Sequence, residues 1–236
     1  MAKARLDKII ANQFNVSRKD ARIGIKQGKA TVNGATIRDF SLIVDTENEI
    51  TFGGQAMDYK EYIYILMNKP KGVLSATNDK SQKTVVDLVP SRWRRLGLFP
   101  VGRLDKDTTG LLIITDDGDF AHKAIAPNKN IYKTYEVTLD GAVTEEMVEA
   151  FKNGVTLADG TLCKKAILTP ISENKAEIKI SEGKYHQIKR MFGTVGLGVD
   201  ELKRTALGGL KLPQDLATGG CRLLSDNEIS LIFTSC

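Results

Sequence analysis

The densest group of chemically reactive side chains lies in one short segment near the middle of the chain. Its charged members are Arg103, Asp105, Lys106, Asp107, Asp116 and Asp117. Residues two apart in an extended segment point to the same side, so Arg103 and Asp105 can face one site. The apolar run 111–114 would partly remove Asp105 from water, whereas a neighbouring cation would keep its carboxylate ionised. An ionised, partly dehydrated aspartate is a competent nucleophile.

Two simpler interpretations of this segment remain open on the residues alone. An ion pair between Arg103 and Asp105 that merely closes a turn is a common arrangement. The segment also has the spacing of a calcium loop, with oxygen-bearing residues at the first, third, fifth and twelfth positions and Gly110 at the sixth. Calcium binding is disfavoured, because an EF-hand needs a helix on each side and residues 111–115 have the pattern of a strand.

The composition describes a globular chain with unevenly distributed charge. The 236 residues are 42% hydrophobic and 27% charged, which indicates one large domain or two modest ones. The net charge is +5, but residues 1–40 carry +6 and the other 196 residues sum to −1. That balance permits a polyanionic partner. Because no apolar run approaches the roughly 20 residues of a membrane span and no signal-like start is present, we expect a cytoplasmic protein with no membrane association.

Metal and disulfide chemistry are disfavoured by the cysteine and histidine content. Cys163, Cys221 and Cys236 are far apart and form no C-x-x-C pair, and only two histidines are present. This pattern matches neither a structural zinc site nor a disulfide framework. We therefore expect no metal at the reactive segment.

The basic N-terminal segment is predicted to form two helices and a small sheet. Apolar residues at positions 6, 9, 10 and 14 have helical spacing, and Ser17 precedes a second helix as its cap. The turn Asn33-Gly34 predicts a hairpin between strands at 30–32 and 35–37, with a last strand at 49–52. The stretch 53–60 has the composition of a linker.

The rest of the chain has more strands than helices. Strands are predicted at 62–67, 111–115, 132–139, 166–171 and 176–180, with helices at 144–153 and 186–195. Asp116 and Asp117 indicate a turn that caps a helix over 119–124. Because the strands are not separated by regular helices, we expect an α+β fold with a mostly antiparallel mixed sheet rather than a doubly wound one.

The N-terminal pattern resembles the S4 RNA-binding module over residues 3–52. The order is R-L-D-K, then S-R-x-x-A, then a glycine, then V-N-G. The resemblance implies that the second helix lies on RNA phosphates, which supply affinity and orientation but little sequence choice. The contacts it implies are Arg5, Arg18, Lys19, Arg22 and Lys26. On the residues alone, the four that follow Arg5 in this list fit the solvent-exposed face of a helix equally well.

Three ordered motifs in the body of the chain resemble those of pseudouridine synthases. They are G-R-L-D-x-D-T-x-G-L from Gly102, K-T-Y from Lys133, and E-G-K-Y-H-Q-I-K-R-M-F from Glu182. The wording of the third is most similar to the RsuA family, which acts on small-subunit ribosomal RNA. The resemblance implies an S4-like domain with linker over residues 1–58 and a pseudouridine synthase catalytic domain over 59–236.

The resemblance also implies a role for each matched residue. Members of the family isomerise uridine to pseudouridine without cofactor or metal. Asp105 would attack C1′ of the ribose or assist departure of uracil to a glycal, and the sequence leaves both routes open. Tyr135 would lie against the base and act as general base, although a half-buried strand tyrosine is the plain alternative. Lys189 would pair with Asp105, where the family commonly has arginine. Arg103 would fill the place of the flipped uridine, and Arg190 would face phosphate.

The implied substrate is one uridine of small-subunit (16S) ribosomal RNA, uridine 516, presented by an assembly intermediate to a monomeric enzyme. The alternatives are a relative that acts on large-subunit (23S) RNA and a non-catalytic RNA-binding assembly protein. A second basic spot, Arg92-Trp93-Arg94-Arg95, suits RNA contact, while Trp93 fits a core position equally well.

Overall fold

The structure is a computed structural model that describes residues 3–234. Its contacts divide the chain into two compact units. The N-terminal unit comprises the chain up to Ile63 together with Val89–Leu98, and the C-terminal unit comprises Tyr64–Leu88 and the chain from Phe99 onward. The division therefore falls after residue 63 instead of after residue 58, and a short internal segment joins the N-terminal unit.

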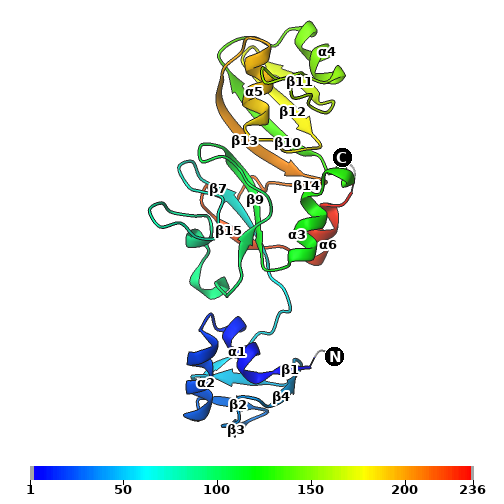
Figure 1. Cartoon of the computed structure of the whole chain (residues 1–236). Helices are drawn as coiled ribbons and strands as arrows, with labels where there is room; N and C mark the ends of the chain where they lie inside the picture. The colour runs from blue at the N-terminus through cyan, green and yellow to red at the C-terminus, as the bar shows by residue number, and fades with distance from the viewer. Residues whose placement is uncertain (1–2, 235–236) are drawn as a thin grey trace. The chain divides into compact units, whose positions relative to one another are not determined.

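The N-terminal unit consists of two helices and two small antiparallel sheets (Figure 1). The elements are β1 (Lys3–Arg5), α1 (Leu6–Gln13), α2 (Arg18–Lys26), β2 (Ala30–Val32), β3 (Ala35–Ile37), β4 (Ile43–Asp45), β5 (Ile50–Phe52) and β6 (Gln55–Ala56). Strands pair in the order β3-β2-β5-β6, and β1 pairs with β4. The predicted cap is confirmed, because the Ser17 hydroxyl accepts a bond from the Asp20 amide at 3.1 Å. Both predicted helices and the hairpin are confirmed.

The stretch predicted as a linker is packed onto the N-terminal unit. Part of it forms β6, and Met57 and Tyr59 lie against the core of this unit. The next residues are held by Arg95, which is buried and donates to the carbonyls of Lys60 at 2.7 Å and Glu61 at 2.8 Å. The linker prediction was wrong because polar turn residues also suit a short hairpin strand.

The C-terminal unit is built on a nine-stranded sheet in the order β11-β12-β10-β13-β9-β7-β15, with β14 on β13 and β8 on β9. Its strands are β7 (Tyr64–Lys69), β8 (Phe99–Pro100), β9 (Thr109–Thr115), β10 (Lys133–Leu139), β11 (Ile167–Ser172), β12 (Lys175–Ile180), β13 (Val199–Leu207), β14 (Leu210–Lys211) and β15 (Cys221–Leu223). Its α-helices are α3 (Gly118–Ile125), α4 (Glu145–Asn153), α5 (Gln187–Thr194) and α6 (Asp226–Leu231). Of the pairs described, β13–β9 is parallel and the others are antiparallel. The predicted α+β class with a mostly antiparallel mixed sheet is confirmed.

An apolar cluster and an aromatic contact hold the helices of this unit in place. Leu111 and Ile113 of β9 pack in one cluster with Phe120 of α3. On α5, Phe192 is fully buried and its ring lies 4.9 Å from that of Phe151 on α4. The helices therefore dock through ordinary burial of aromatic and aliphatic side chains, which removes apolar surface from water.

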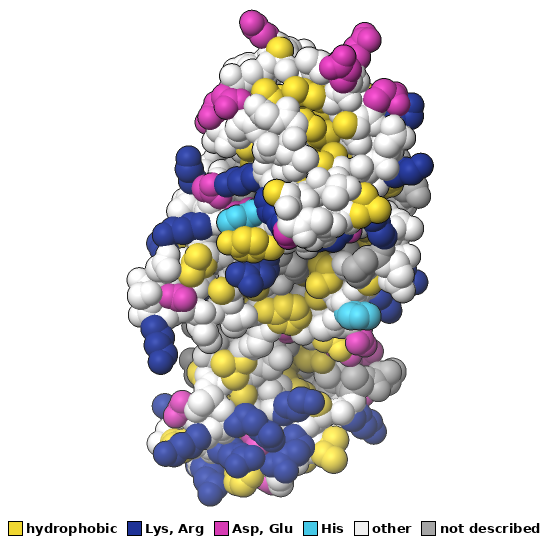
Figure 2. Space-filling model, turned by 45° about the horizontal axis from the view of Figure 1, so that its top comes forward, with side chains coloured by type: hydrophobic (Ala, Val, Ile, Leu, Met, Phe, Trp, Pro, Cys, Tyr) yellow, Lys and Arg dark blue, Asp and Glu magenta, His cyan; other side chains and the backbone are white. Residues whose placement is uncertain are grey.

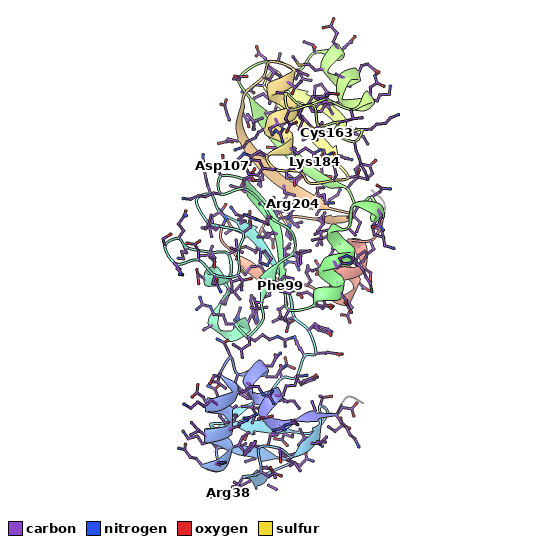
Figure 3. All side chains as sticks on the ribbon, in the orientation of Figure 1. Arg38, Phe99, Asp107, Cys163, Lys184 and Arg204 are labelled. Atoms are coloured by element: carbon purple, nitrogen blue, oxygen red, sulfur yellow. The ribbon has the colours of Figure 1, made fainter. Side chains whose placement is uncertain are left out.

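The parallel contact between β9 and β13 is unusually close. A Cβ on Gly110 would lie 2.2 Å from the Arg204 carbonyl oxygen, and Gly110 has φ of +97°. Arg204 lies in the middle part of the C-terminal unit (Figure 3). Its buried guanidinium donates to the Leu111 carbonyl at 2.7 Å. Only glycine fits there, so the loop that precedes β9 is fixed to the middle of the sheet.

Within residues 3–234, none of the helices combines the length and apolar character that crossing a bilayer would need.

Candidate active site

The loop that carries Asp105 is held through its backbone. Ser75 brackets Leu104: its hydroxyl donates to the Leu104 carbonyl at 2.8 Å and accepts from the Leu104 amide at 3.1 Å. The Thr108 amide then donates to the Asp105 carbonyl at 3.1 Å, which closes a turn. The Asp105 side chain is thereby fixed at its base while its carboxylate remains 31% exposed.

A fully buried lysine at the end of β7 supports the same loop. The Lys69 ammonium donates to the carbonyls of Thr108 at 2.9 Å, Pro70 at 3.1 Å and Lys106 at 3.3 Å. Burial lowers the pKa of Lys69 to about 8, and the carboxylates of Asp107 and Asp105 oppose that shift. Lys69 thus places a positive charge beneath the loop and ties two of its carbonyls to the carbonyl of Pro70.

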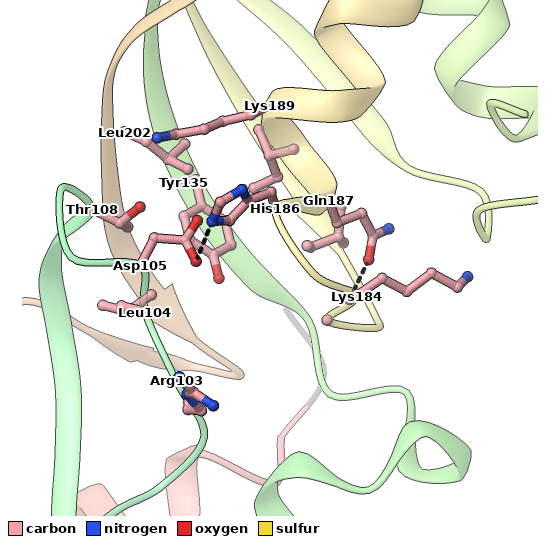
Figure 4. Close-up of a pocket in the computed structure, with 13 residues that line it drawn as sticks. Arg103, Leu104, Asp105, Thr108, Tyr135, Lys184, His186, Gln187, Lys189 and Leu202 are labelled. Carbon is pink, nitrogen blue, oxygen red and sulfur yellow. Dashed lines mark hydrogen bonds and ion pairs between the residues drawn. The ribbon is translucent and has the colours of Figure 1, made fainter. Parts of the chain in front are cut away.

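One small pocket, open to solvent, brings together the four residues predicted for the reaction. Asp105, Tyr135, Lys189 and Arg103 all line it (Figure 4). Tyr135 comes from β10 and is 7% exposed, so its ring forms part of the pocket wall. The exposed Arg103 lies at the other end of the Asp105 loop.

The basic side chain that faces Asp105 is His186. Its Nε2 lies 3.6 Å from Oδ1 of Asp105, a contact that is ionic when the imidazole is protonated. His186 immediately precedes α5 with φ of +48°, a left-handed conformation that is uncommon for residues other than glycine. Its ring stacks on the exposed Tyr185 with centroids 3.9 Å apart. Strained backbone of this kind is often stored at functional sites.

Lys189 does not pair with Asp105 as expected. Its ammonium forms a short ion pair with Asp107, and the hydrogen bond from Lys189 holds the pKa of the Asp107 carboxyl below its usual range. The motif fixed which helix faces the loop, but it did not distinguish two carboxylates only two residues apart. Lys189 therefore anchors the loop at Asp107, two positions beyond Asp105.

The third motif holds its own shape before the helix begins. Gln187 accepts a bond from the Lys184 amide at 2.9 Å and donates to Glu182 at 2.9 Å. Lys184 pairs with the same Glu182 at 2.7 Å. These contacts fix the turn from which His186 reaches Asp105.

A buried hydroxyl at the pocket has no partner in the described part of the chain. Thr108 lines the pocket and is 2% exposed, and its Oγ1 makes no hydrogen bond within residues 3–234. A buried polar atom left in that state carries a desolvation cost of about 1–3 kcal/mol.

The residues predicted to contact phosphate make other contacts. Arg190 forms a short ion pair with Asp159. In the N-terminal unit, Arg5, Arg18 and Arg22 converge on the buried Asp7. Lys19 is exposed, and the Lys26 ammonium lies 5.2 Å from the centroid of the Phe40 ring. At the second basic spot, Arg92 covers the half-buried Trp93 at 4.4 Å, and Arg95 is buried.

No group of three or more His, Cys, Asp or Glu side chains suited to a metal ion occurs between residues 3 and 234. Cys163 and Cys221 are free thiols, and Cys236 lies outside the described residues.

Sequence reasoning missed three residues of this site. His186 was one of only two histidines and lay inside a motif, which was a usable signal. Lys69 ends an otherwise apolar strand, and a lysine there already suggests a buried charge. Thr108 gave no signal, because a threonine in a polar loop is usually exposed and its burial follows from the tertiary fold.

Comparisons with known proteins agree with this geometry. A family model described as RNA pseudouridylate synthase matches residues 63–194. The chain is 42% identical to "Uncharacterized RNA pseudouridine synthase YtzG" of Bacillus subtilis, over 97% of this chain and 98% of the relative. It is 39% identical to "Ribosomal small subunit pseudouridine synthase A" of Escherichia coli, over 97% and 99%. It is also 36% identical to "Ribosomal large subunit pseudouridine synthase B" of Bacillus subtilis, over 95% and 93%.

A solved structure described as "Crystal structure of pseudouridylate synthase" superposes with a TM-score of 0.68 at 33% identity, covering 97% of this chain and 99% of the other. Sequence, fold and site motifs point to one family along nearly the whole length. The chain belongs to the RNA pseudouridine synthases.

Proposed function

We propose that this enzyme converts one uridine of small-subunit (16S) ribosomal RNA, uridine 516, to pseudouridine, with Asp105 as nucleophile. The observation that carries the proposal is that Asp105 is held at its backbone while its carboxylate stays open beside Tyr135 in one pocket. The choice of RNA is supported by the 39% identity to the small-subunit enzyme over almost all of both chains.

The chemistry is an isomerisation and needs no other reactant. A carboxylate oxygen of Asp105 attacks C1′ of the ribose, and the bond from C1′ to N1 breaks with its electrons leaving on uracil. The base rotates, and its C5 attacks C1′ and displaces the carboxylate. A proton leaves C5 and one is gained at N1, so atoms balance. The Tyr135 hydroxyl borders the rotating base. It accepts the C5 proton and releases its own proton, which reaches N1, so the side chain ends in its starting state.

Two further groups prepare this step. His186 orients the Asp105 carboxylate through the 3.6 Å contact. The exposed Arg103 fills the stack that the flipped uridine vacates, because a planar guanidinium stacks on bases. Flipping a base from folded RNA costs a few kcal/mol, which such a substitute partly offsets.

We assign RNA docking to the N-terminal unit as an S4-like module. Its support is the motif order in residues 3–52 and the basic side chains on the face of this unit shown in Figure 2. In this proposal the enzyme acts as a monomer in the cytoplasm on an assembly intermediate, where the target uridine is still accessible.

The target is tested by mapping pseudouridine after incubation of the full-length enzyme with 16S and 23S transcripts, and with small-subunit particles from cells that lack the protein. We expect one new pseudouridine in 16S RNA at uridine 516, formed fastest in the particles. The 36% identity to a large-subunit enzyme makes 23S RNA the second candidate. Modification of 23S RNA alone would overturn the proposed target.

A further inference from the structure

The N-terminal unit contains a carboxylate with no exposed surface, surrounded by three arginines. Asp7, in the first turn of α1, is 0% exposed. It accepts bonds from Arg5 at 3.1 and 3.2 Å, from Arg18 at 3.2 and 3.3 Å, and from Arg22 at 2.7 Å. Burial alone would raise the pKa of Asp7, but the bonds from Arg22, Arg5 and Arg18 outweigh it and lower the pKa to about 2. The carboxylate is therefore charged at any working pH.

The three arginines are fixed on one side and open on the other. Their bonds to Asp7 use Nε and Nη2 only, so the Nη1 group of each guanidinium lies outside this contact. Their side chains stay 42–51% exposed. Each guanidinium is held at its base and presents its remaining donors to solvent.

An aromatic ring adds a second restraint on the same cations. The centroid of the Phe40 ring lies 5.3 Å from Arg22 and 5.2 Å from the Lys26 ammonium. The Asp7 amide also donates to the Phe40 carbonyl at 3.2 Å, which joins the backbones of the two residues. A cation at such a distance from an aromatic face is attracted to it. Four basic side chains are thus arranged around one aspartate and one ring.

Rigid arginines suit the RNA backbone better than mobile ones. A guanidinium binds a phosphate with parallel N–H bonds in a fixed fork. Each long side chain immobilised on binding costs free energy, and a side chain that is already fixed avoids most of that loss. Asp7 carries one negative charge and its three arginine partners carry three positive charges, so the cluster keeps a net positive charge.

We infer that Asp7 is a positioning residue that holds Arg5, Arg18 and Arg22 as a preformed binding surface for RNA backbone phosphates. This inference rests on the proposed docking of RNA by the N-terminal unit. It reverses the simple electrostatic expectation, since removing a negative charge from an RNA-binding surface should otherwise tighten binding.

The test compares two isosteric variants of the full chain that each raise the net charge by one. Asp7→Asn removes the ordering carboxylate, and Glu47→Gln removes an exposed one in the same unit. Affinity for a 16S RNA transcript is measured by filter binding between about 50 and 200 mM KCl. We expect Asp7→Asn to bind about fivefold more weakly with a shallower salt dependence. Glu47→Gln should bind as tightly as the wild type or slightly more tightly. Asp7→Asn binding as tightly as Glu47→Gln would overturn the inference.

A second variant keeps the test valid if Asp7→Asn fails to fold. Arg22→Lys retains the charge but replaces a fork by a single ammonium, and it should weaken binding about as much as Arg22→Gln. If Arg22→Lys binds like the wild type, ordering of the guanidinium is not used and the inference fails. If Arg18→Gln and Arg22→Gln both leave the affinity and its salt dependence unchanged, the proposed docking of RNA by this unit is wrong, and the inference is wrong with it. Pseudouridine formation at saturating RNA reports separately on the catalytic proposal.

Discussion

Two aspartates in this chain lie beside cations and yet have opposite surroundings. Asp7 has no exposed surface and accepts bonds from three arginines. Asp105 is 31% exposed, and its one ionic partner among residues 3–234 is His186 at 3.6 Å. Asp7 has its lone pairs saturated by donors, whereas Asp105 has them open to a pocket.

The difference separates a carboxylate that holds structure from one that can react. A buried carboxylate that lost its partners would be strongly destabilising, so Asp7 is useful because it is fully paired. A nucleophile needs an unshared electron pair directed at its target, and each additional donor would make that pair less available. Asp105 is instead held through its backbone by Ser75 and Lys69, which leaves its carboxylate oxygens free for substrate.

The largest effect on stability is expected at Asp7. Asp7→Asn should lower the free energy of unfolding of the N-terminal unit by about 3 kcal/mol, because three guanidinium groups lose their buried partner. Asp105→Asn should change the stability of the C-terminal unit by no more than about 0.5 kcal/mol. Urea unfolding of both full-length variants measures this. Equal losses in the two would contradict the comparison.

Acid should expose the same contrast in the unmodified protein. The pKa of Asp7 is about 2 in the folded protein, and its ordinary value is 3.8. The ionised carboxylate therefore stabilises the fold fully at pH values above 3.8. That contribution, about 2 kcal/mol, is lost as pH falls from about 4 to 2. The N-terminal unit of Asp7→Asn should therefore show a shallower decline of stability with acid than the wild type. Parallel acid titrations of the two proteins would refute this assignment.

Lys69 should make catalysis sensitive to alkali. With a pKa of about 8, Lys69 loses its charge as pH rises past that value, and the loop below Asp105 loses part of its support. The single-turnover rate should fall about tenfold between pH 7 and 10. The free energy of unfolding should instead increase over this range. Burying the charged ammonium destabilises the fold below pH 8, and this cost disappears between pH 8 and 10.5 as Lys69 loses its proton. A single-turnover rate that is unchanged up to pH 10 would show that the charge on Lys69 does not support catalysis.

The smallest effect expected is at the orienting histidine. His186→Gln should slow the single-turnover rate by about fivefold with RNA affinity unchanged, because Asp105 loses its one ionic partner in the described chain. The matched control is Lys189→Gln, which removes a cation from the same pocket but from Asp107. Its rate should fall less. If Lys189→Gln slowed the reaction more than His186→Gln, Lys189 and not His186 would be the functional partner of Asp105.

The sequence predicted the elements whose apolar pattern is regular. Strand β9 was found from its continuous apolar run, the first N-terminal helix from its apolar spacing and the second from its Ser17 cap. Strand β13 was missed although it lies between β10 and β9, because Asp200, Glu201, Lys203 and Arg204 interrupt any apolar alternation. A strand that is central by topology can still carry charge where its side chains reach the sheet surface or a backbone carbonyl, as Arg204 does.

The candidate site was predicted in part of its membership but not in its pairing. The three motifs placed Asp105, Tyr135 and Lys189 in one pocket, and the structure brings them together. Which cation faces which carboxylate depends on the left-handed backbone of His186, and no spacing rule reveals a single residue with φ of +48°. Tertiary contacts decide the backbone conformation of a single residue at the start of a helix, and sequence spacing does not report them.

The most direct test of the central claim is the rate of pseudouridine formation by Asp105→Asn under single-turnover conditions, with saturating 16S RNA. Asparagine keeps the shape of the side chain and removes the charged oxygen that would attack C1′. The account predicts a loss of at least about a thousandfold with RNA affinity within a few-fold of the wild type. Turnover within about tenfold of the wild type would contradict it and place the nucleophile elsewhere.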